Sequence, residues 1–279
     1  MDSLNTISPA RRRVLSALAV LGGGGLSCTA AREAQDTSPQ PVSPSTPTSA
    51  TAVQVQMLVH PDMTALDLIG PQLIFSTMGN TQTHLVWKDL SPITTDSGVR
   101  ILPTLTLAEA PESPDILFVP GGLKGTTAML QDADVLGYLR TRGASARWVT
   151  GVCTGALLLG AAGLLKGYRA TAHWYVRDLL TVFDATPVTQ RVVVDRNRIT
   201  GGGVTSGIDM ALTVSALLKG EQQARIQELV FEYAPEPPYA SGTPQLAGDA
   251  LTQLVLKRRE PAIEMARQAA LKARARWPT

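Results

Sequence analysis

The chain has 279 residues, of which 44% are hydrophobic and 17% are charged, and its formal net charge is +2. This composition is typical of a folded protein with one large or two small domains, and it excludes an intrinsically disordered chain. Because the folded part contains no block of basic residues, we expect no nucleic-acid partner. Two cysteines and three dispersed histidines lack metal-ligand spacing, so we expect neither a disulfide framework nor a bound metal.

The first 30 residues are typical of an export signal. The basic cluster Arg11–Arg13 precedes an uncharged stretch, residues 14–28, that ends in small side chains. The stretch is too short for a transmembrane helix, and the basic cluster resembles a twin-arginine signal. We therefore expect an exported protein, periplasmic or associated with the cell envelope. Cleavage near Ala30 predicts a soluble form and a lipid anchor at Cys28 predicts a membrane-attached form; an uncleaved basic N-terminus is the alternative.

The composition changes twice after the signal. Residues 31–52 are rich in Pro, Ser and Thr and predict an extended linker. Because residues 1–30 hold three Arg and one Asp, residues 31–279 carry 22 basic and 22 acidic side chains and no net charge. We expect one catalytic domain over residues 53–245, followed by a basic helix over residues 246–279 that packs on the domain or extends it.

Strand and helix patterns alternate through the folded part. Apolar runs predict strands at 53–60, 83–88, 98–107, 115–122, 146–152 and 169–173, and a hairpin formed by 191–195 and 198–200. Helical patterns cover a segment beginning at Pro71, then 132–144, 155–165, 174–183, 205–218, 221–233 and 246–275. Strands that are apolar on both faces and alternate with helices predict a doubly wound, parallel α/β sheet with helices on both faces. Ligands of such sheets bind at the carboxyl ends of the strands.

One motif at a predicted strand end carries a candidate nucleophile. Residues 151–155 read Gly-Val-Cys-Thr-Gly, the form of a nucleophile elbow with Cys153 at its centre. The following helix start favours the thiolate form of Cys153. We expect the backbone N–H groups of Thr154 and Gly122 to stabilise developing negative charge. The alternative is that Cys153 is a buried structural cysteine.

Two further ionisable residues are candidates for proton transfer. Asp67 lies among apolar neighbours between a strand and a helix, where partial burial raises a carboxyl pKa; the alternative is that Asp67 caps the helix. His173 follows a short strand and can serve as a base for Cys153, or it can be structural. Gly202 and Gly203 precede a helix and predict a loop beside the substrate pocket.

These residues belong to strings that resemble the ThiJ/PfpI superfamily, whose fold is related to class I glutamine amidotransferases. The strings are LDLIGP (66–71), HLVWK (84–88), VPGG (119–122), VTGVCTGALLLGAAGLLKG (149–167), RATAHW (169–174), ITGGGVTSGID (199–209) and LVFEYAPEPPY (229–239). Within the superfamily they are most similar to the isonitrile hydratase branch. The resemblance covers roughly two thirds of the chain, and the predicted export signal departs from it.

The resemblance implies a flavodoxin-like fold, a homodimer, and a cofactor-free site formed by Cys153, Asp67 and Thr154. It implies the addition of water to an isocyanide (isonitrile) to give an N-substituted formamide. Two alternatives remain. A cysteine hydrolase or lyase acting on amides, peptides or glyoxals would depend more on His173. A non-enzymatic envelope protein would use Cys153 as a redox-sensitive thiol.

Overall fold

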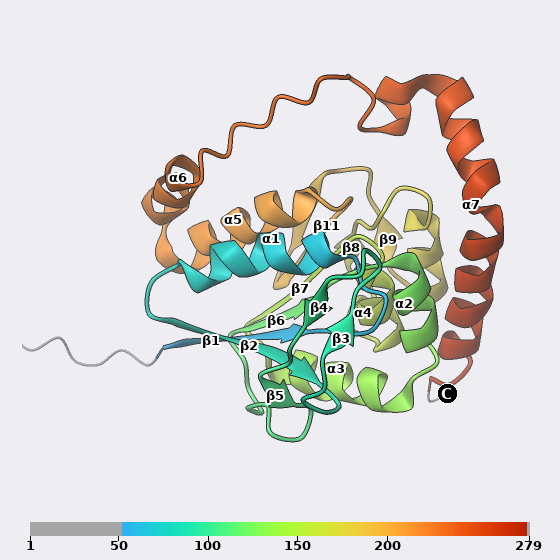
Figure 1. Cartoon of the computed structure of the whole chain (residues 1–279). Helices are drawn as coiled ribbons and strands as arrows, with labels where there is room; N and C mark the ends of the chain where they lie inside the picture. Colours follow the sequence, from blue (N-terminus) through green and yellow to red (C-terminus); the bar gives the residue numbers. More distant parts are fainter. Residues whose placement is uncertain (1–51, 278–279) are drawn as a thin grey trace, which may run out of the picture. The chain divides into compact units, whose positions relative to one another are not determined.

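The computed structural model describes residues 52–277. The predicted signal with Cys28, and the predicted linker up to residue 51, lie outside the described residues. Residues 52–277 fall within one compact unit, Ser49–Thr279. Within this unit, one or more strands alternate with one or more helices along the chain up to the C-terminal helices (Figure 1).

A seven-stranded sheet forms the centre of the unit, in the order β10-β11-β7-β6-β1-β2-β5. All neighbouring strands in it are parallel except β10 and β11, which form the predicted antiparallel hairpin. Two short pairs, β3 with β4 and β8 with β9, lie outside this sheet. The strands are β1 (Val53–Leu58), β2 (Thr81–Trp87), β3 (Ile93–Thr94), β4 (Arg100–Ile101), β5 (Leu105–Thr106), β6 (Ile116–Val119), β7 (Trp148–Val152), β8 (Arg169–Ala170), β9 (Thr186–Pro187), β10 (Val192–Asp195) and β11 (Arg198–Gly201).

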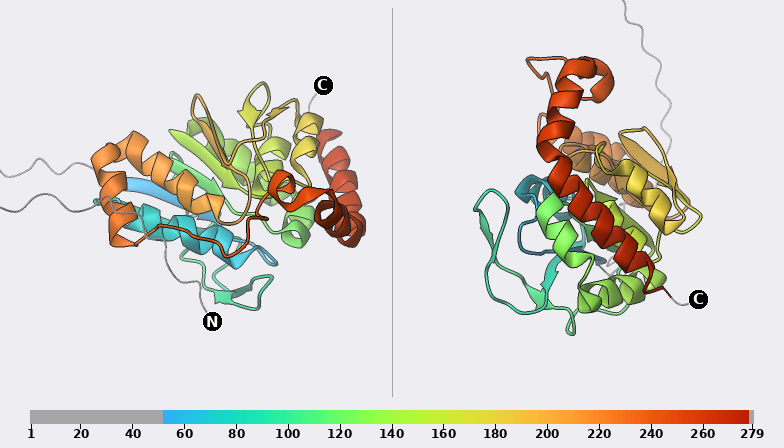
Figure 2. Two further views of the ribbon diagram at one scale, coloured as in Figure 1. Left: turned by 90° about the horizontal axis from the view of Figure 1, so that it is seen from above. Right: turned by 90° about the vertical axis from the view of Figure 1, so that its right-hand side faces the viewer.

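Helices cover both faces of the sheet (Figures 1 and 2). One layer contains α1 (Ala65–Ser76), α5 (Ser206–Lys219) and α6 (Glu221–Val230), of which α5 packs on both of the others. The second layer contains α2 (Leu123–Met129), α3 (Ala133–Ser145), α4 (Gly155–Ala161), the 3-10 helix η1 (Arg177–Phe183) and α7 (Pro244–Arg274). The fold is therefore a doubly wound α/β sandwich, as the sequence pattern predicted, and it is flavodoxin-like, as the family resemblance implied.

The core lies between the sheet and these two layers. The central strand β6 is buried at all four residues, and the helix α4 is buried at all seven. A strand and a helix that are apolar on every side must lie between other elements, which explains their continuous hydrophobic runs. These two elements end and begin, respectively, at the same edge of the sheet.

The largest difference from the sequence prediction concerns α1. The helix begins at Ala65 rather than at Pro71, so that Pro71 lies inside it. A proline inside a helix costs a backbone hydrogen bond, and sequence patterns therefore favour a helix start there. Here Pro71 packs against Gly207 of α5, where an added Cβ would lie 3.0 Å from the proline ring. Close packing of α1 on α5 thus supports a helix that runs through the proline.

Smaller differences occur in the second layer. The helix α2 was not predicted, and the segment predicted as a helix over 174–183 is a 3-10 helix beginning at Arg177. The helix α4 ends at Ala161, since Gly163 takes a left-handed conformation with φ of 81°. Within residues 52–277, no helix combines the length and hydrophobicity needed to span a bilayer.

A long connection joins the two layers at the C-terminal end of the chain. Residues 231–243 run from α6 to α7 and are mostly exposed. Figure 1 shows this connection, which we call the strap, passing over the open edge of the domain before α7 descends along the second layer. The helix α7 is kinked at Gly248, and beyond the kink it packs on α2, α4 and η1.

Candidate active site

The candidate nucleophile Cys153 lies in the turn between β7 and α4. Its φ is +59°, a left-handed value that is uncommon for a residue other than glycine, as expected in a nucleophile elbow. The neighbouring Gly155 permits the turn, because a Cβ there would lie 2.4 Å from the carbonyl oxygen of Val119. The side chain of Cys153 is 4% exposed. The backbone therefore holds the thiol in a fixed position at the carboxyl end of the sheet.

Asp67 approaches Cys153 from a different strand end. It is the third residue of α1, and its side chain is completely buried. Its Oδ2 accepts a hydrogen bond of 2.9 Å from the N–H of Gly121. The N-cap position of the helix is Thr64, whose side chain makes no capping hydrogen bond, and Asp67 accepts no hydrogen bond from its own helix start. The alternative interpretation of Asp67 as a capping residue is thus wrong.

The loop after β6 joins these two residues. In the sheet, β6 lies between β7, which leads to Cys153, and β1, which leads to Asp67. A Cβ on Gly121 would lie 2.6 Å from the Thr154 nitrogen and 2.8 Å from both the Asp67 Oδ2 and the Cys153 Cβ. Only glycine fits between the carboxyl group and the elbow, and this contact sets the separation of the two groups.

Burial controls the ionisation of both groups. It raises the pKa of Asp67 to about 7, although the Gly121 hydrogen bond and interaction with the Cys153 thiol both lower it. Burial, followed by the negative charge of Asp67, raises the pKa of Cys153 well above its ordinary value. The N–H groups of Thr154 and Gly122 lower the thiol pKa, but burial outweighs them. The helix-start N–H groups thus act in the predicted direction, but because burial outweighs them Cys153 needs an adjacent base.

Thr154 connects the elbow to α2. Its Oγ1 accepts a 2.9 Å hydrogen bond from the N–H of Gly122 and lies 2.7 Å from the Oγ1 of Thr126. The Gly122 N–H is thereby fixed beside Cys153 but is already hydrogen-bonded to a side chain. The roles of Thr154 and Gly122 as donors to developing negative charge stay predictions.

His173 lies beside the elbow, but its imidazole does not pair with the thiol. The backbone N–H of His173 donates to the Cys153 carbonyl oxygen at 3.1 Å, and its ring centroid lies 3.8 Å from that of Tyr175. Among residues 52–277, no hydrogen bond joins the imidazole to Cys153. Burial, and then the charges of Arg259 and Arg177, lower the pKa of His173 to about 4. The ring is neutral at pH 7 and is placed to shape the cavity.

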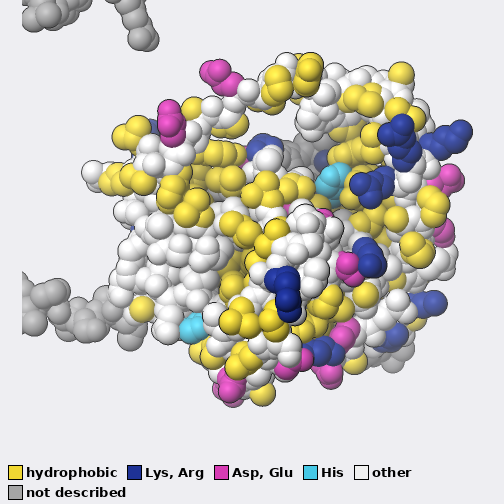
Figure 3. All heavy atoms as spheres, viewed as in Figure 1, with side chains coloured by type: hydrophobic (Ala, Val, Ile, Leu, Met, Phe, Trp, Pro, Cys, Tyr) yellow, Lys and Arg dark blue, Asp and Glu magenta, His cyan; other side chains and the backbone are white. Residues whose placement is uncertain are grey.

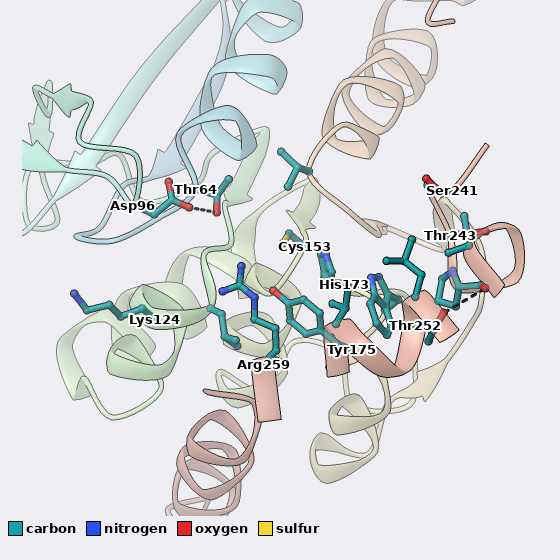
Figure 4. Close-up of a pocket in the computed structure, with 18 of the residues that line it drawn as sticks. Thr64, Asp96, Lys124, Cys153, His173, Tyr175, Ser241, Thr243, Thr252 and Arg259 are labelled. Carbon is teal, nitrogen blue, oxygen red and sulfur yellow. Dashed lines mark hydrogen bonds between the residues drawn. The ribbon is translucent and has the colours of Figure 1, made fainter. Parts of the chain in front are cut away.

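A cavity of about 710 Å³ opens above Cys153. Figure 3 shows a hollow beneath the strap, and Figure 4 shows side chains from several elements converging on Cys153. One part of the wall comes from the loops before α1 and around Asp96, together with the start of α2. A second part comes from His173, Trp174 and Tyr175. A third part comes from the strap and α7, through residues 241–244, 247, 251, 252, 255 and 259. The wall thus continues beyond residue 245, into the segment predicted as a separate C-terminal helix.

Comparison with known proteins identifies the family. The DJ-1/PfpI family pattern matches residues 53–217, more than half of the chain. The isonitrile hydratase of Pseudomonas putida is 45% identical over 214 residues, which cover 77% of this chain and 93% of that protein. The chain belongs to the DJ-1/PfpI family.

Solved structures of the DJ-1/PfpI family agree with this fold. The crystal structure of a ThiJ/PfpI family protein from Pseudomonas syringae has a TM-score of 0.77 and 42% identity, covering 79% of this chain and 91% of that one. Drosophila melanogaster DJ-1beta is 21% identical with a TM-score of 0.61, covering 66% of this chain and all of that one, and shows the fold alone.

A second cavity explains where the predicted glycine loop lies. Gly202 and Gly203 line a space of about 620 Å³ beside Arg177 and Gln190, not the cavity above Cys153. The next residue, Val204, lines both spaces, as do His173 and Trp174. The sequence predicted that Gly202 and Gly203 form a loop beside the substrate pocket. In the structure they line the neighbouring space and lie next to Val204, which is part of the wall of the Cys153 cavity.

Sequence reasoning missed several cavity residues of this DJ-1/PfpI chain. Tyr175 lies two residues after His173, so the predicted role of His173 could have led to Tyr175 as a further cavity residue. Arg259 lies on α7, beyond the residues that the family pattern matches, and no motif marked it. On the facing wall, Asp96 accepts a 2.7 Å hydrogen bond from Thr64 Oγ1. No cluster of potential metal ligands occurs among the described residues.

Proposed function

We propose that this protein is a cysteine-dependent hydro-lyase that adds water to an isocyanide and forms an N-substituted formamide. The observation that carries the proposal is the buried carboxyl group of Asp67 beside Cys153, which itself lines a large cavity. The similarity of this chain to the Pseudomonas putida isonitrile hydratase, over nearly the whole length of that protein, supports the same reaction.

The first step needs a nucleophile and a proton carrier in contact. The terminal carbon of an isocyanide, R–N≡C, both accepts a nucleophile and ends up bearing a proton. As Sγ of Cys153 attacks this carbon, Asp67 takes the thiol proton and delivers it to the same carbon. The product is a thioimidate, Cys–S–CH=N–R, and Asp67 is left ionised. A carboxyl pKa of about 7 suits Asp67 to both halves of this transfer.

The second step adds water. Ionised Asp67 removes a proton from water as the water oxygen attacks the thioimidate carbon, and Asp67 then passes this proton to the imine nitrogen and is ionised again. The intermediate, Cys–S–CH(OH)–NH–R, then loses its hydroxyl proton to the departing sulfur through Asp67 as the C–S bond breaks. The products are the formamide and the free thiol, with no net change in protons on the protein.

Thr154 and Gly122 support this chemistry in the proposal. Thr154 holds the Gly122 N–H beside the sulfur, and the Thr154 N–H lowers the thiol pKa. Both donors favour the sulfur while it carries negative charge, during attack and departure. The reaction requires no cofactor, because Asp67 carries each proton.

The direct test uses residues 31–279 incubated with cyclohexyl isocyanide, with formation of N-cyclohexylformamide followed by mass spectrometry. We expect product from the wild type and none above background from Cys153→Ala, with both proteins showing the same thermal unfolding. If both leave the isocyanide unchanged, the hydratase proposal is wrong.

His173→Ala separates the hydratase from a cysteine hydrolase. A neutral imidazole that makes no hydrogen bond to the thiol predicts that the variant keeps hydration activity within about tenfold of wild type. A loss as large as that caused by Cys153→Ala would instead assign His173 as the base.

The location and assembly of the enzyme are also proposals. The basic cluster Arg11–Arg13 and the apolar stretch after it support export, with Cys28 as a candidate lipid anchor. Fractionation of cells that express the full chain, with Cys28→Ala and Arg11→Lys/Arg12→Lys variants alongside, tests both. We further propose a homodimer, for which exposed apolar residues on α1 provide support.

A further inference from the structure

One face of α7 has an apolar pattern with a single exception. Leu251, Val255 and Arg259 follow one another at intervals of four residues and line the cavity above Cys153. The same face continues into the buried alanines Ala266, Ala270 and Ala273, which pack against the second layer. Positions at this spacing share one side of a helix. Among these six positions only Arg259 is charged, and it lies where α7 passes from the cavity wall to the core contact.

The side chain of Arg259 is directed into the cavity. Figure 4 shows its guanidinium group and the hydroxyl group of Tyr175 next to one another, on the side of the cavity that faces Cys153. The charge of Arg259 acts on the ionisation of both Tyr175 and His173, which places the guanidinium close to the two rings. Two hydrogen-bond donors from different elements thus lie near the reacting sulfur.

The other charged residues of this cavity already have partners. Lys124 pairs with Asp62 at 3.1 Å, and Asp96 accepts the hydroxyl group of Thr64. Among the described residues, Arg259 has neither a carboxylate within ion-pair distance nor an acceptor for its guanidinium. Arg259 is exposed on the cavity side, so its guanidinium is available to form a bidentate pair with an anion that enters the cavity.

We propose that Arg259, with the Tyr175 hydroxyl group, binds a carboxylate on the substrate, so that the preferred isocyanides are those whose R group carries a carboxylate. This inference rests on the proposed hydratase function. Guanidinium and carboxylate form two parallel hydrogen bonds, a geometry that fixes the R group while the isocyanide carbon faces Cys153. The cavity of about 710 Å³ has room for a ring or chain between the two ends, and Leu251 and Val255 provide apolar contact for it.

The test compares two substrates that differ only in the carboxylate. Cyclohexyl isocyanide and 4-isocyanocyclohexane-1-carboxylate are assayed with wild type, Arg259→Gln, Arg259→Lys and the control Arg258→Gln. Arg258 and Arg259 are both exposed, but only Arg259 lines the cavity. We expect wild type and Arg258→Gln to prefer the carboxylate by about tenfold or more in kcat/KM, and Arg259→Gln to lower this ratio to near one. Arg259→Lys keeps part of the preference.

A binding measurement separates this inference from the hydratase proposal. In a Cys153→Ser background, the change in tryptophan fluorescence reports the Kd of each compound without turnover, because Trp174 lines the cavity. A carboxylate preference that Arg259→Gln abolishes and Arg258→Gln keeps supports the inference even if neither compound is hydrated, an outcome that refutes only the hydratase. Equal Kd values for the two compounds, or a preference that survives Arg259→Gln, overturn the inference.

Discussion

Asp67 and Cys153 form a buried acid–thiol pair, although one belongs to α1 and the other to the turn between β7 and α4. The sheet order explains the pairing. The strands that lead to the two residues flank β6, and Gly121 after β6 donates its N–H to the carboxylate while contacting the elbow. The pair is therefore a property of the parallel sheet and of one glycine, rather than of any contiguous sequence motif.

Replacing Asp67 by Asn keeps the shape of the side chain and removes its ability to carry a proton. We expect Asp67→Asn to lower kcat/KM for cyclohexyl isocyanide by about 10²-fold to 10⁴-fold, the range for loss of a general acid–base group. We also expect the thiol pKa to fall, because the negative charge of Asp67 raises it. The pH dependence of alkylation by iodoacetamide measures the second effect. An unchanged alkylation profile would show that the two groups do not interact.

The pKa of Asp67 also predicts how stability depends on pH. The folded-state pKa of about 7 lies above the ordinary value of 3.8, so the folded protein binds the proton more tightly than the unfolded chain. The associated stability is fully present below about pH 4 and is lost as the pH rises through 7. Urea unfolding should show the wild type losing up to ~4 kcal/mol relative to Asp67→Asn between pH 4 and pH 8. Parallel pH profiles for the two proteins would contradict this assignment.

Gly121 offers a test of the contact that holds the pair together. In Gly121→Ala the new methyl group would overlap the Thr154 nitrogen, the Asp67 Oδ2 and the Cys153 Cβ. We expect a loss of about 1–3 kcal/mol in the free energy of unfolding and a marked loss of hydration activity. Gly137→Ala is the matched control, since nothing lies within 4 Å of its Cβ position on α3, and alanine favours a helix. If the two variants behave alike, the close contact at Gly121 is not what sets the site geometry.

The parts of the site that the sequence predicted are those with local signals. The elbow at Cys153 and the alternation of strands and helices depend on patterns within a few residues, and both appear in the structure. The start of α1 at Ala65 depends on packing against α5, whereas the position of Pro71 led to the prediction of a helix that begins there. The raised thiol pKa depends on burial from all sides. Arg259 reaches the cavity only because the strap returns the chain to the open edge, a path that no local pattern reveals.

The proposed homodimer makes a prediction about α1. Leu66, Ile69 and Leu73 follow one side of this helix and are 44%, 44% and 43% exposed, an unusual exposure for three apolar side chains at helical spacing. Because a second copy would cover this side, Ile69→Glu would place an uncompensated charge in the interface and should shift the protein toward monomer in size-exclusion chromatography with light scattering. Leu102→Glu, at a loop residue that is 61% exposed, is the control and should leave the mass unchanged. A monomeric wild type would overturn the homodimer proposal. An Ile69→Glu dimer that is as stable on dilution as the wild type would place the interface elsewhere. Since Asp67 lies on the same helix, loss of the dimer should also lower hydration activity, which links assembly to the geometry of the acid–thiol pair.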